Sequence, residues 1–324
     1  MATGVRVLPA RPGKGGHIRQ KLMTDRRLRG VCRHTGFACL MVLALAGCEA
    51  PNDRPLHGYL FFPSGKYLGQ LSLASGEAMP VANFGEQRVE HVSALDNQEL
   101  LLSVFKPGGG RGRYRVLRFH PIRLSSSTLL VGRQAHYLSP SGVIVYDSGT
   151  ALQAVQRRNV RRAPTLLQSD SWQRPAELVS LGEAGLLFQP SGELIQHFDP
   201  ETGGYRALGR LSSACRLGDA VWLAANARLA CRAPEDQGDS APYRLVSLDG
   251  DIDGSLSLPA GRRFRAVAYV PDQRILILNE TRVRWFSKSE RYPVWAYDVA
   301  TGGLRAIAEN QYLGATAVYR RSLR

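Results

Sequence analysis

Short apolar segments rich in strand-forming residues recur at nearly equal intervals from residue 58 to the end of the chain. They read GYLFF, ELLLSVF, GVIVY, GLLF, RLAC and RILIL, and they begin at Gly58, Glu99, Gly142, Gly185, Arg228 and Arg274. Their spacings are 41, 43, 43, 43 and 46 residues. Such a period predicts six copies of one structural unit built from short β-strands.

The loops between these segments repeat in the same register. PSGKYLGQLSLASGE from Pro63 aligns with PSGELIQHFDPETGG from Pro190 at an offset of 127 residues, which equals three of the spacings. Pro-Ser-Gly favours a tight hairpin turn, because Pro presets φ and Gly accepts a positive φ. A unit of roughly 40 to 50 residues suits one four-stranded blade of a β-propeller. We therefore predict an all-β, six-bladed β-propeller over residues 58–320.

Two segments far apart in the chain share one further motif. FDPETGGYRAL at 198–208 and YDVATGGLRAI at 297–307 have Asp, Thr, Gly, Gly, Arg and Ala at matching positions. The motif is expected to end the third strand of a blade, where the Asp caps a turn and the Gly pair reverses the chain into the outer strand.

The segment WAYDVATGGL at 295–304 resembles the third-strand signature of WD40-like, YVTN-type and PQQ-type propeller repeats. The resemblance implies a propeller and leaves the function open. This chain departs from those families because it has no recurring Gly-His to Trp-Asp pairing and no regular outer-strand Trp.

The first blade lacks sequence for its inner strand. Only nine residues, EAPNDRPLH, separate Cys48 from Gly58. The segment GATAVYR at 314–320 follows a complete sixth blade, and we expect it to supply the missing strand. Such pairing would remove open sheet edges.

The N-terminal region has the order of a secretory signal peptide. Arg26, Arg27, Arg29 and Arg33 precede the apolar run GFACLMVLALAG at 36–47, whose twelve residues are fewer than the roughly 20 that a membrane-spanning helix needs. We predict a signal peptide over residues 1–47. Met23 is a better start than Met1, because it leaves 25 residues before the cut.

The segment LAGC at 45–48 resembles the lipobox of bacterial lipoproteins. The resemblance implies a diacylglycerol on the Cys48 thiol, an acylated amine, and residues 48–57 as the lipidated Cys and a short tether. In that family Asp after the Cys favours the inner membrane, so Glu49 implies the outer membrane, facing the periplasm. The alternative is a plain signal peptide followed by an unrelated Cys.

The basic composition gives no sign of nucleic-acid binding. The chain of 324 residues is 44% hydrophobic and has a formal net charge of +15, of which residues 1–47 contribute +8. The remaining +7 forms no helix-like basic face or aromatic-flanked basic groove, so no nucleic-acid partner is predicted.

Two cysteines follow Cys48, and both are expected in an oxidising compartment. Aligning AVWLAANARLACRA from Ala220 with AVAYVPDQRILILN from Ala266 places Cys231 near the end of a second strand and Cys215 just before a first strand. Antiparallel strands bring these positions to the same face. We predict a disulfide between them, with two buried free thiols as the alternative.

No set of residues indicates catalysis, a metal or a cofactor. There is no C-x-x-C or H-x-x-H spacing and no G-x-S-x-G motif, and the Gly-rich segment KPGGGRGR at 106–113 lacks the Lys-Ser/Thr ending of a P-loop and suits a hairpin loop. Six-bladed lactonases hold calcium with acidic and Asn side chains at the ring centre, and no such set can be assembled here. The histidines after Cys48 are widely separated: His57, His91, His120, His136 and His197.

Two basic segments carry alternative interpretations. QRRNVRR at 156–162 belongs to the outer half of the third blade, where charge protects an edge strand or contacts an anionic lipid or glycan. ETRVRWFSKSERY at 280–292 lengthens the last blade, either as a packed insertion or strand extension or as a loop that binds a partner. Aromatic and Arg residues dominate interface hot spots. The partner-binding candidates are Arg282, Arg284, Trp285, Phe286, Lys288 and Arg291.

The leading hypothesis is a lipid-anchored envelope protein whose propeller is a platform for a protein partner. The alternative is a lactonase-like hydrolase or a small-ligand-binding protein with its site at the central opening. A structural spacer without a dedicated partner is a third hypothesis.

Overall fold

The computed structural model describes residues 55–96, 98–108, 113–160, 165–168, 177–190, 194–235, 241–283, 290–314 and 316–322. In this part of the chain almost all regular structure is antiparallel β-sheet. Helical structure in the same residues is limited to α1 (Gly209–Ala214) and the 3-10 turns η2 (Arg157–Asn159) and η3 (Gly182–Ala184). The signal peptide and Cys48 lie outside the described residues.

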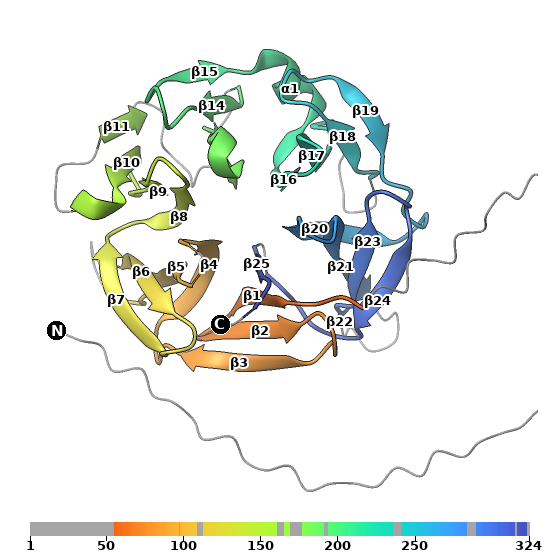
Figure 1. Ribbon diagram of the computed structural model, residues 1–324, viewed down its shortest axis with the longest axis horizontal. Helices are drawn as coiled ribbons and strands as arrows, with labels where there is room; N and C mark the ends of the chain where they lie inside the picture. The colour runs from red at the N-terminus through yellow and green to blue at the C-terminus, as the bar shows by residue number, and fades with distance from the viewer. Residues whose placement is uncertain are drawn as a thin grey trace, which may run out of the picture. The chain divides into compact units, whose positions relative to one another are not determined.

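Six sheets surround a common centre, and the prediction of a six-bladed all-β propeller is confirmed (Figure 1). From the inside outward, the first sheet contains β25 (Val318–Arg320), β1 (Tyr59–Ser64), β2 (Tyr67–Ser72) and β3 (Ala78–Asn83). The second sheet contains β4 (Arg88–Ala94), β5 (Leu100–Phe105), β6 (Tyr114–His120) and β7 (Ser125–Leu130). The third sheet contains β8 (Arg133–Leu138), β9 (Val143–Asp147), β10 (Leu152–Gln156) and β11 (Thr165–Gln168).

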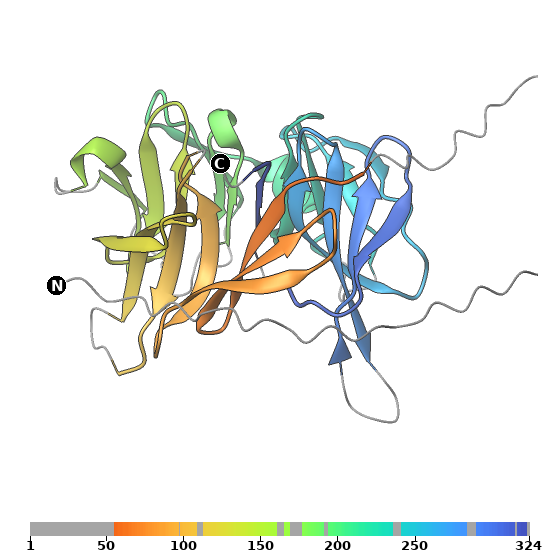
Figure 2. The same cartoon turned by 60° about the horizontal axis from the view of Figure 1, so that its bottom comes forward.

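The other three sheets follow the same order. They are β12 (Glu177–Ser180), β13 (Leu186–Gln189), β14 (Gln196–Phe198) and β15 (Tyr205–Ala207); β16 (Arg216–Leu223), β17 (Arg228–Arg232), β18 (Arg244–Val246) and β19 (Ile252–Ser255); and β20 (Arg263–Val270), β21 (Ile275–Val283), β23 (Val294–Asp298) and β24 (Leu304–Ala308), with β22 (Glu290–Arg291) paired to the end of β21. Figure 2 shows the same sheets after a turn of 60°.

The six apolar segments that define the period are the second strands of the six sheets, β1, β5, β9, β13, β17 and β21. Each is buried on both faces, because successive side chains point toward opposite neighbouring sheets. In β5, Leu101 packs with Ile144 of the third sheet, whereas Leu102 packs with Phe61 of the first. Complete burial of a Leu stabilises by about 1.5–3 kcal/mol. A strand buried on both faces reads as a continuous apolar run, which explains the strength of the period.

The first sheet combines the two ends of the described chain. β25 pairs antiparallel with β1, with Tyr59 opposite Arg320, Leu60 opposite Tyr319 and Phe61 opposite Val318. On the other side of β1, Tyr59 is opposite Ser72 of β2.

The repeated Asp-x-x-Thr-Gly-Gly motif forms the predicted turn in both places. The side chain of Asp298 accepts hydrogen bonds from the backbone N–H groups of Ala300 at 2.8 Å and Thr301 at 3.1 Å, and Gly302 has a φ of 74°. Asp199 accepts the equivalent bonds, at 2.8 and 3.4 Å. Each turn connects a third strand to an outer strand, as expected from the sequence.

A disulfide joins Cys215, which precedes β16, to Cys231 in β17, with the Cα atoms 5.6 Å apart. Both residues are at most 1% exposed. Within the described part of the chain, none of the helical segments has the length and apolar character needed to cross a bilayer.

Candidate partner-binding surface

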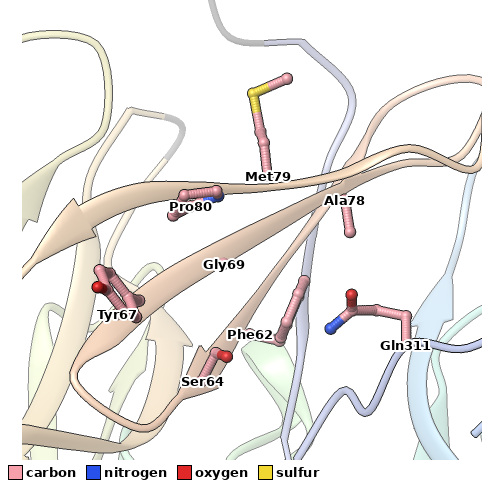
Figure 3. Close-up of a pocket in the computed structure, with 8 residues that line it drawn as sticks. All are labelled: Phe62, Ser64, Tyr67, Gly69, Ala78, Met79, Pro80 and Gln311. Carbon is pink, nitrogen blue, oxygen red and sulfur yellow. The ribbon is translucent and has the colours of Figure 1, made fainter. Parts of the chain in front are cut away.

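A hollow of about 230 Å³ opens between the first sheet and the segment that follows β24 (Figure 3). It lies over the second to fourth strands of the sheet, away from the innermost strand β25. Figure 3 shows Gln311 reaching it beside Phe62. The hollow is lined by Phe62, Ser64, Tyr67, Gly69, Ala78, Met79, Pro80 and Gln311.

The base of the hollow depends on Gly69. A Cβ atom at this position would lie 2.5 Å from the ring of Phe62, which is closer than carbon atoms pack. Phe62 is only 2% exposed, whereas Met79 on the outer strand β3 is 53% exposed. The hollow therefore joins a buried aromatic ring to an exposed apolar rim.

Asn279 holds Gln311 in place from the sixth sheet. The Asn279 side chain is 4% exposed and donates hydrogen bonds to the carbonyl oxygens of Gln311 and Pro293, both at 3.1 Å. Its own oxygen accepts a bond from the backbone N–H of Leu313 at 3.0 Å. The Gln311 N–H also donates to the carbonyl of Tyr292 at 2.8 Å. One buried amide thus fixes two segments where the sixth and first sheets meet.

Two aromatic residues are neighbours of Gln311 at this junction: Tyr312 follows it in the chain, and Tyr292 accepts its backbone hydrogen bond. The rings of Tyr292 and Tyr312 lie 4.8 Å apart, and Tyr312 is 50% exposed. Exposed apolar side chains clustered around a concave site are typical of interaction surfaces. We use the name seam surface for the surface formed by Tyr67, Met79, Pro80, Tyr292 and Tyr312.

The seam surface continues into an extension of β21. Arg282 is paired with Arg291, and Val283 with Glu290, so the ends of the segment 280–292 belong to a two-stranded ribbon. Of the interpretations open from the sequence, a strand extension holds for these residues. Tyr292 directly follows the ribbon.

An acidic side chain that the sequence did not single out organises this ribbon. Glu280 is 3% exposed; it accepts a hydrogen bond from Arg282 at 2.8 Å and another from the indole N–H of Trp295 at 2.9 Å. The bond to Glu280 raises the pKa of Arg282. The guanidinium groups of Arg282 and Arg262 both lie over the Trp295 ring. Arg282 is therefore held in the fold and is less available to a partner than the sequence suggested.

The other predicted partner-binding residues divide into two groups. Arg291 is exposed on β22 beside the seam surface. The remaining four candidates lie outside the described residues: Arg284, Trp285, Phe286 and Lys288.

The basic segment 156–162 begins at the last residue of β10 and leads toward β11, in the outer half of the third sheet as predicted. The expectation of an edge strand is wrong for Arg157–Asn159, which form η2. Arg157 binds the second sheet, with its guanidinium 2.8 Å from Asp96 and 3.1 Å from Glu99. This pairing orders a turn instead of an extended strand. Residues 161 and 162 lie outside the described part.

The structure brings together two histidines that the sequence leaves separate. His91 of β4 and His136 of β8 have ring centroids 4.8 Å apart and are 6% and 8% exposed. Nδ1 of His91 and Nε2 of His136 have no hydrogen-bond partner. Burial lowers the pKa of His136 to about 4, and burial together with His136 lowers the pKa of His91 well below 6.5. Their spacing of 45 residues, close to the repeat, is the signal that could have revealed the pair.

The described residues contain no group of three or more His, Cys, Asp or Glu side chains arranged to hold a metal ion. The buried basic residue Arg232 serves the fold. It lies over the ring of Tyr243 and donates hydrogen bonds to the carbonyl oxygens of Phe264 and Ala241.

Neither a protein-family model nor a curated protein sequence matches the chain. Similarity to solved structures is clear. A chain of a nidogen/laminin complex has a TM-score of 0.56 at 11% identity, covering 80% of this chain and 97% of that one. A putative TolB from Agrobacterium tumefaciens has a TM-score of 0.53 at 10% identity, covering 81% and 97%. TolB from Acinetobacter baumannii has a TM-score of 0.51 at 8% identity, covering 82% of this chain and 65% of that one. At these identities the likeness establishes the propeller fold.

Proposed function

We propose that the chain is a lipoprotein of the bacterial envelope, anchored through Cys48 to the outer membrane and facing the periplasm, whose propeller binds a protein partner through the seam surface. The observation that carries the proposal is the junction of the sixth and first sheets. There a hollow, an exposed Met79, an exposed Tyr312 and a projecting ribbon lie together.

The chemistry of this surface suits a protein partner. Aromatic side chains and Met are enriched in interfaces, and a hollow next to them can receive an anchoring side chain of the partner. The ordering of Gln311 by Asn279 reduces the entropy lost on binding, because the rim is already fixed. One structure of similar fold comes from a nidogen/laminin complex, so a propeller of this kind occurs in an assembly of two proteins.

The partner hypothesis is tested by crosslinking in membranes. A variant with Met79→Ala and Tyr312→Ala is compared with one carrying Ile122→Ala and Val131→Ala, whose side chains are similarly exposed, at 55% and 52%, but lie in the turns before and after β7 of the second sheet. We expect the first variant to lose a discrete crosslinked species at least tenfold and the second to keep it. Equal yields from both variants would exclude the seam surface.

A second variant tests two of the partner-binding candidates predicted from the sequence. Trp285→Ala with Phe286→Ala is expected to weaken the same crosslink if the segment 280–292 and the seam surface bind one partner. An undiminished crosslink would restrict the interface to the seam surface.

Lipid anchoring has its own test. Mass spectrometry of the N-terminal peptide of the mature protein should find acyl groups on Cys48, and Cys48→Ser should release the protein from the membrane fraction. An unmodified peptide beginning elsewhere would contradict the anchor.

A further inference from the structure

The chain enters the propeller at a fixed point. The backbone N–H of His57 donates to Oε1 of Gln273 at 3.2 Å, and the His57 carbonyl accepts from Nε2 of the same side chain at 2.9 Å. The His57 ring is 3.2 Å from Oδ2 of Asp272. Both partners belong to the turn between β20 and β21, so the sixth sheet holds the chain just before β1.

The C-terminal strand reinforces this point. The hydroxyl of Tyr319 donates to Asp272 at 3.0 Å and accepts from Gln273 at 3.3 Å. Burial and the bond to Asp272 raise the pKa of Tyr319 to about 12, so the donor proton is present at neutral pH. Gly58 has a φ of 93°, and a Cβ there would lie 2.4 Å from the Tyr319 ring. We call His57, Gly58, Asp272, Gln273 and Tyr319 the terminal clasp.

The clasp lies at the end of the sheets that carries the turns between first and second strands. At this end Arg320 donates to the carbonyl of Glu99, in the turn before β5, and Arg157 binds Asp96 of that same turn. We call this end the turn face. The ribbon extends from the other end of β21, because Ile275 begins that strand next to the clasp and Val283 ends it.

The distance from the clasp to Cys48 is limited by chain length. His57 lies nine positions after Cys48 in the sequence, and nine residue steps of about 3.3–3.6 Å each span roughly 30 Å when fully extended. To reach the opposite face around the rim, the chain would cross two outer strands spaced about 4.8 Å apart and then the length of a six-residue strand, about 20 Å. This path is about as long as the segment between Cys48 and His57 when fully extended, so the segment could reach the opposite face only in a completely extended form.

We propose that the turn face lies against the phospholipid headgroups, with the seam surface directed away from the membrane. This orientation rests on the proposed lipid anchor at Cys48. The side chain of Arg321, 77% exposed beside Asp272, and the exposed Arg274 flank the clasp, where cations favour contact with phosphate groups.

The orientation is tested on the lipidated full chain in vesicles of phosphatidylethanolamine and phosphatidylglycerol that contain a headgroup-spin-labelled lipid. Variants with one added cysteine carry a fluorophore on the turn face, at Gln98→Cys or Ala225→Cys, or on the opposite face, at Lys66→Cys or Lys106→Cys. All four native side chains are exposed in turns. We expect quenching of the turn-face fluorophores to exceed that of the opposite pair at least threefold.

Flotation of the vesicles separates the failures. A protein that floats with the vesicles but shows equal or reversed quenching would overturn the orientation and leave the anchor intact. A protein that does not float would overturn the anchor and the orientation together. Quenching at Ala225→Cys without quenching at Gln98→Cys would show a ring standing on its edge, which also contradicts the proposal.

Discussion

The side chain of Asn279 donates a hydrogen bond to the carbonyl oxygen of Gln311 at 3.1 Å across 32 residues of sequence. Asn279→Ala would also leave the N–H of the fully buried Leu313 without its acceptor. We expect the free energy of unfolding to fall by about 1–3 kcal/mol, the usual cost of an unsatisfied buried group. Denaturant unfolding followed by tryptophan fluorescence measures it.

Asn226 gives the matched control, because it is exposed in the turn between β16 and β17. Asn226→Ala should change the free energy of unfolding by less than about 0.5 kcal/mol. Equal losses in the two variants would mean that the hydrogen bonds of Asn279 do not stabilise the fold. If these bonds order the seam surface, Asn279→Ala should also reduce the crosslink to the partner.

Gly69→Ala tests the base of the hollow. The added methyl would meet the ring of Phe62 at 2.5 Å, and we expect a loss of about 1–3 kcal/mol, typical of overpacking. Gly209→Ala is the control, because a Cβ there has no neighbour within 4 Å and the residue begins α1. The control should be neutral or slightly stabilising. Equal changes in the free energy of unfolding for the two variants would show that the Phe62 ring moves aside without a cost in stability.

The His91–His136 pair predicts a loss of stability in acid. Both pKa values are lowered in the folded state, so the unfolded chain takes up protons first as the pH falls below about 6.5. The loss grows by up to about 1.4 kcal/mol per pH unit for each His, and for His136 it levels off below about pH 4, after about 3 kcal/mol. We expect the Tm to fall as the pH is lowered from 7.5 to 4.5, and thermal unfolding across this range measures it.

His136→Gln should flatten that pH dependence, because the substituted side chain does not titrate. His120→Gln, at a partly exposed position in the second sheet, should leave it as in the parent protein. If the Tm of the His136→Gln variant falls with pH as steeply as that of the parent protein, protonation of this pair is not the cause of the loss in acid.

The disulfide between Cys215 and Cys231 predicts sensitivity to reduction. It closes a separation of 16 residues, for which chain-entropy arguments give about 3 kcal/mol. Reductant should lower the Tm of the parent protein by several degrees and leave that of the variant with Cys215→Ser and Cys231→Ser unchanged. Detection of two free thiols in protein isolated from the envelope would contradict the bond.

The sequence predicts the second strands well and the first strands poorly, for one physical reason. Leu101 and Leu102 are both buried, since β5 lies between two neighbouring sheets, and the apolar run is visible without any alignment. The first strands carry polar residues whose partners lie in the next sheet. Ser93 of β4, for example, donates to the carbonyl of Ala135 in β8, a contact that local pattern cannot reveal.

The seam surface is predictable only in part. The segment 280–292 stands out because Trp285 and Phe286 lie among cations in the sequence. Met79 and Gln311 line the same hollow from opposite ends of the chain, and the buried amide of Asn279, which bonds to Gln311, lies within an apolar strand. Such a site depends on how the last sheet meets the first, which no local signal encodes.

Crosslinking of β1 to its two neighbours tests the closed ring most directly. Tyr59 lies opposite Arg320 of β25 on one side and Ser72 of β2 on the other. A variant with Tyr59→Cys and Arg320→Cys is oxidised beside one with Tyr59→Cys and Ser72→Cys, and the tryptic peptides are identified by mass spectrometry. The closed propeller predicts a linked peptide pair from both variants. A link to position 72 without any link to position 320 would contradict it.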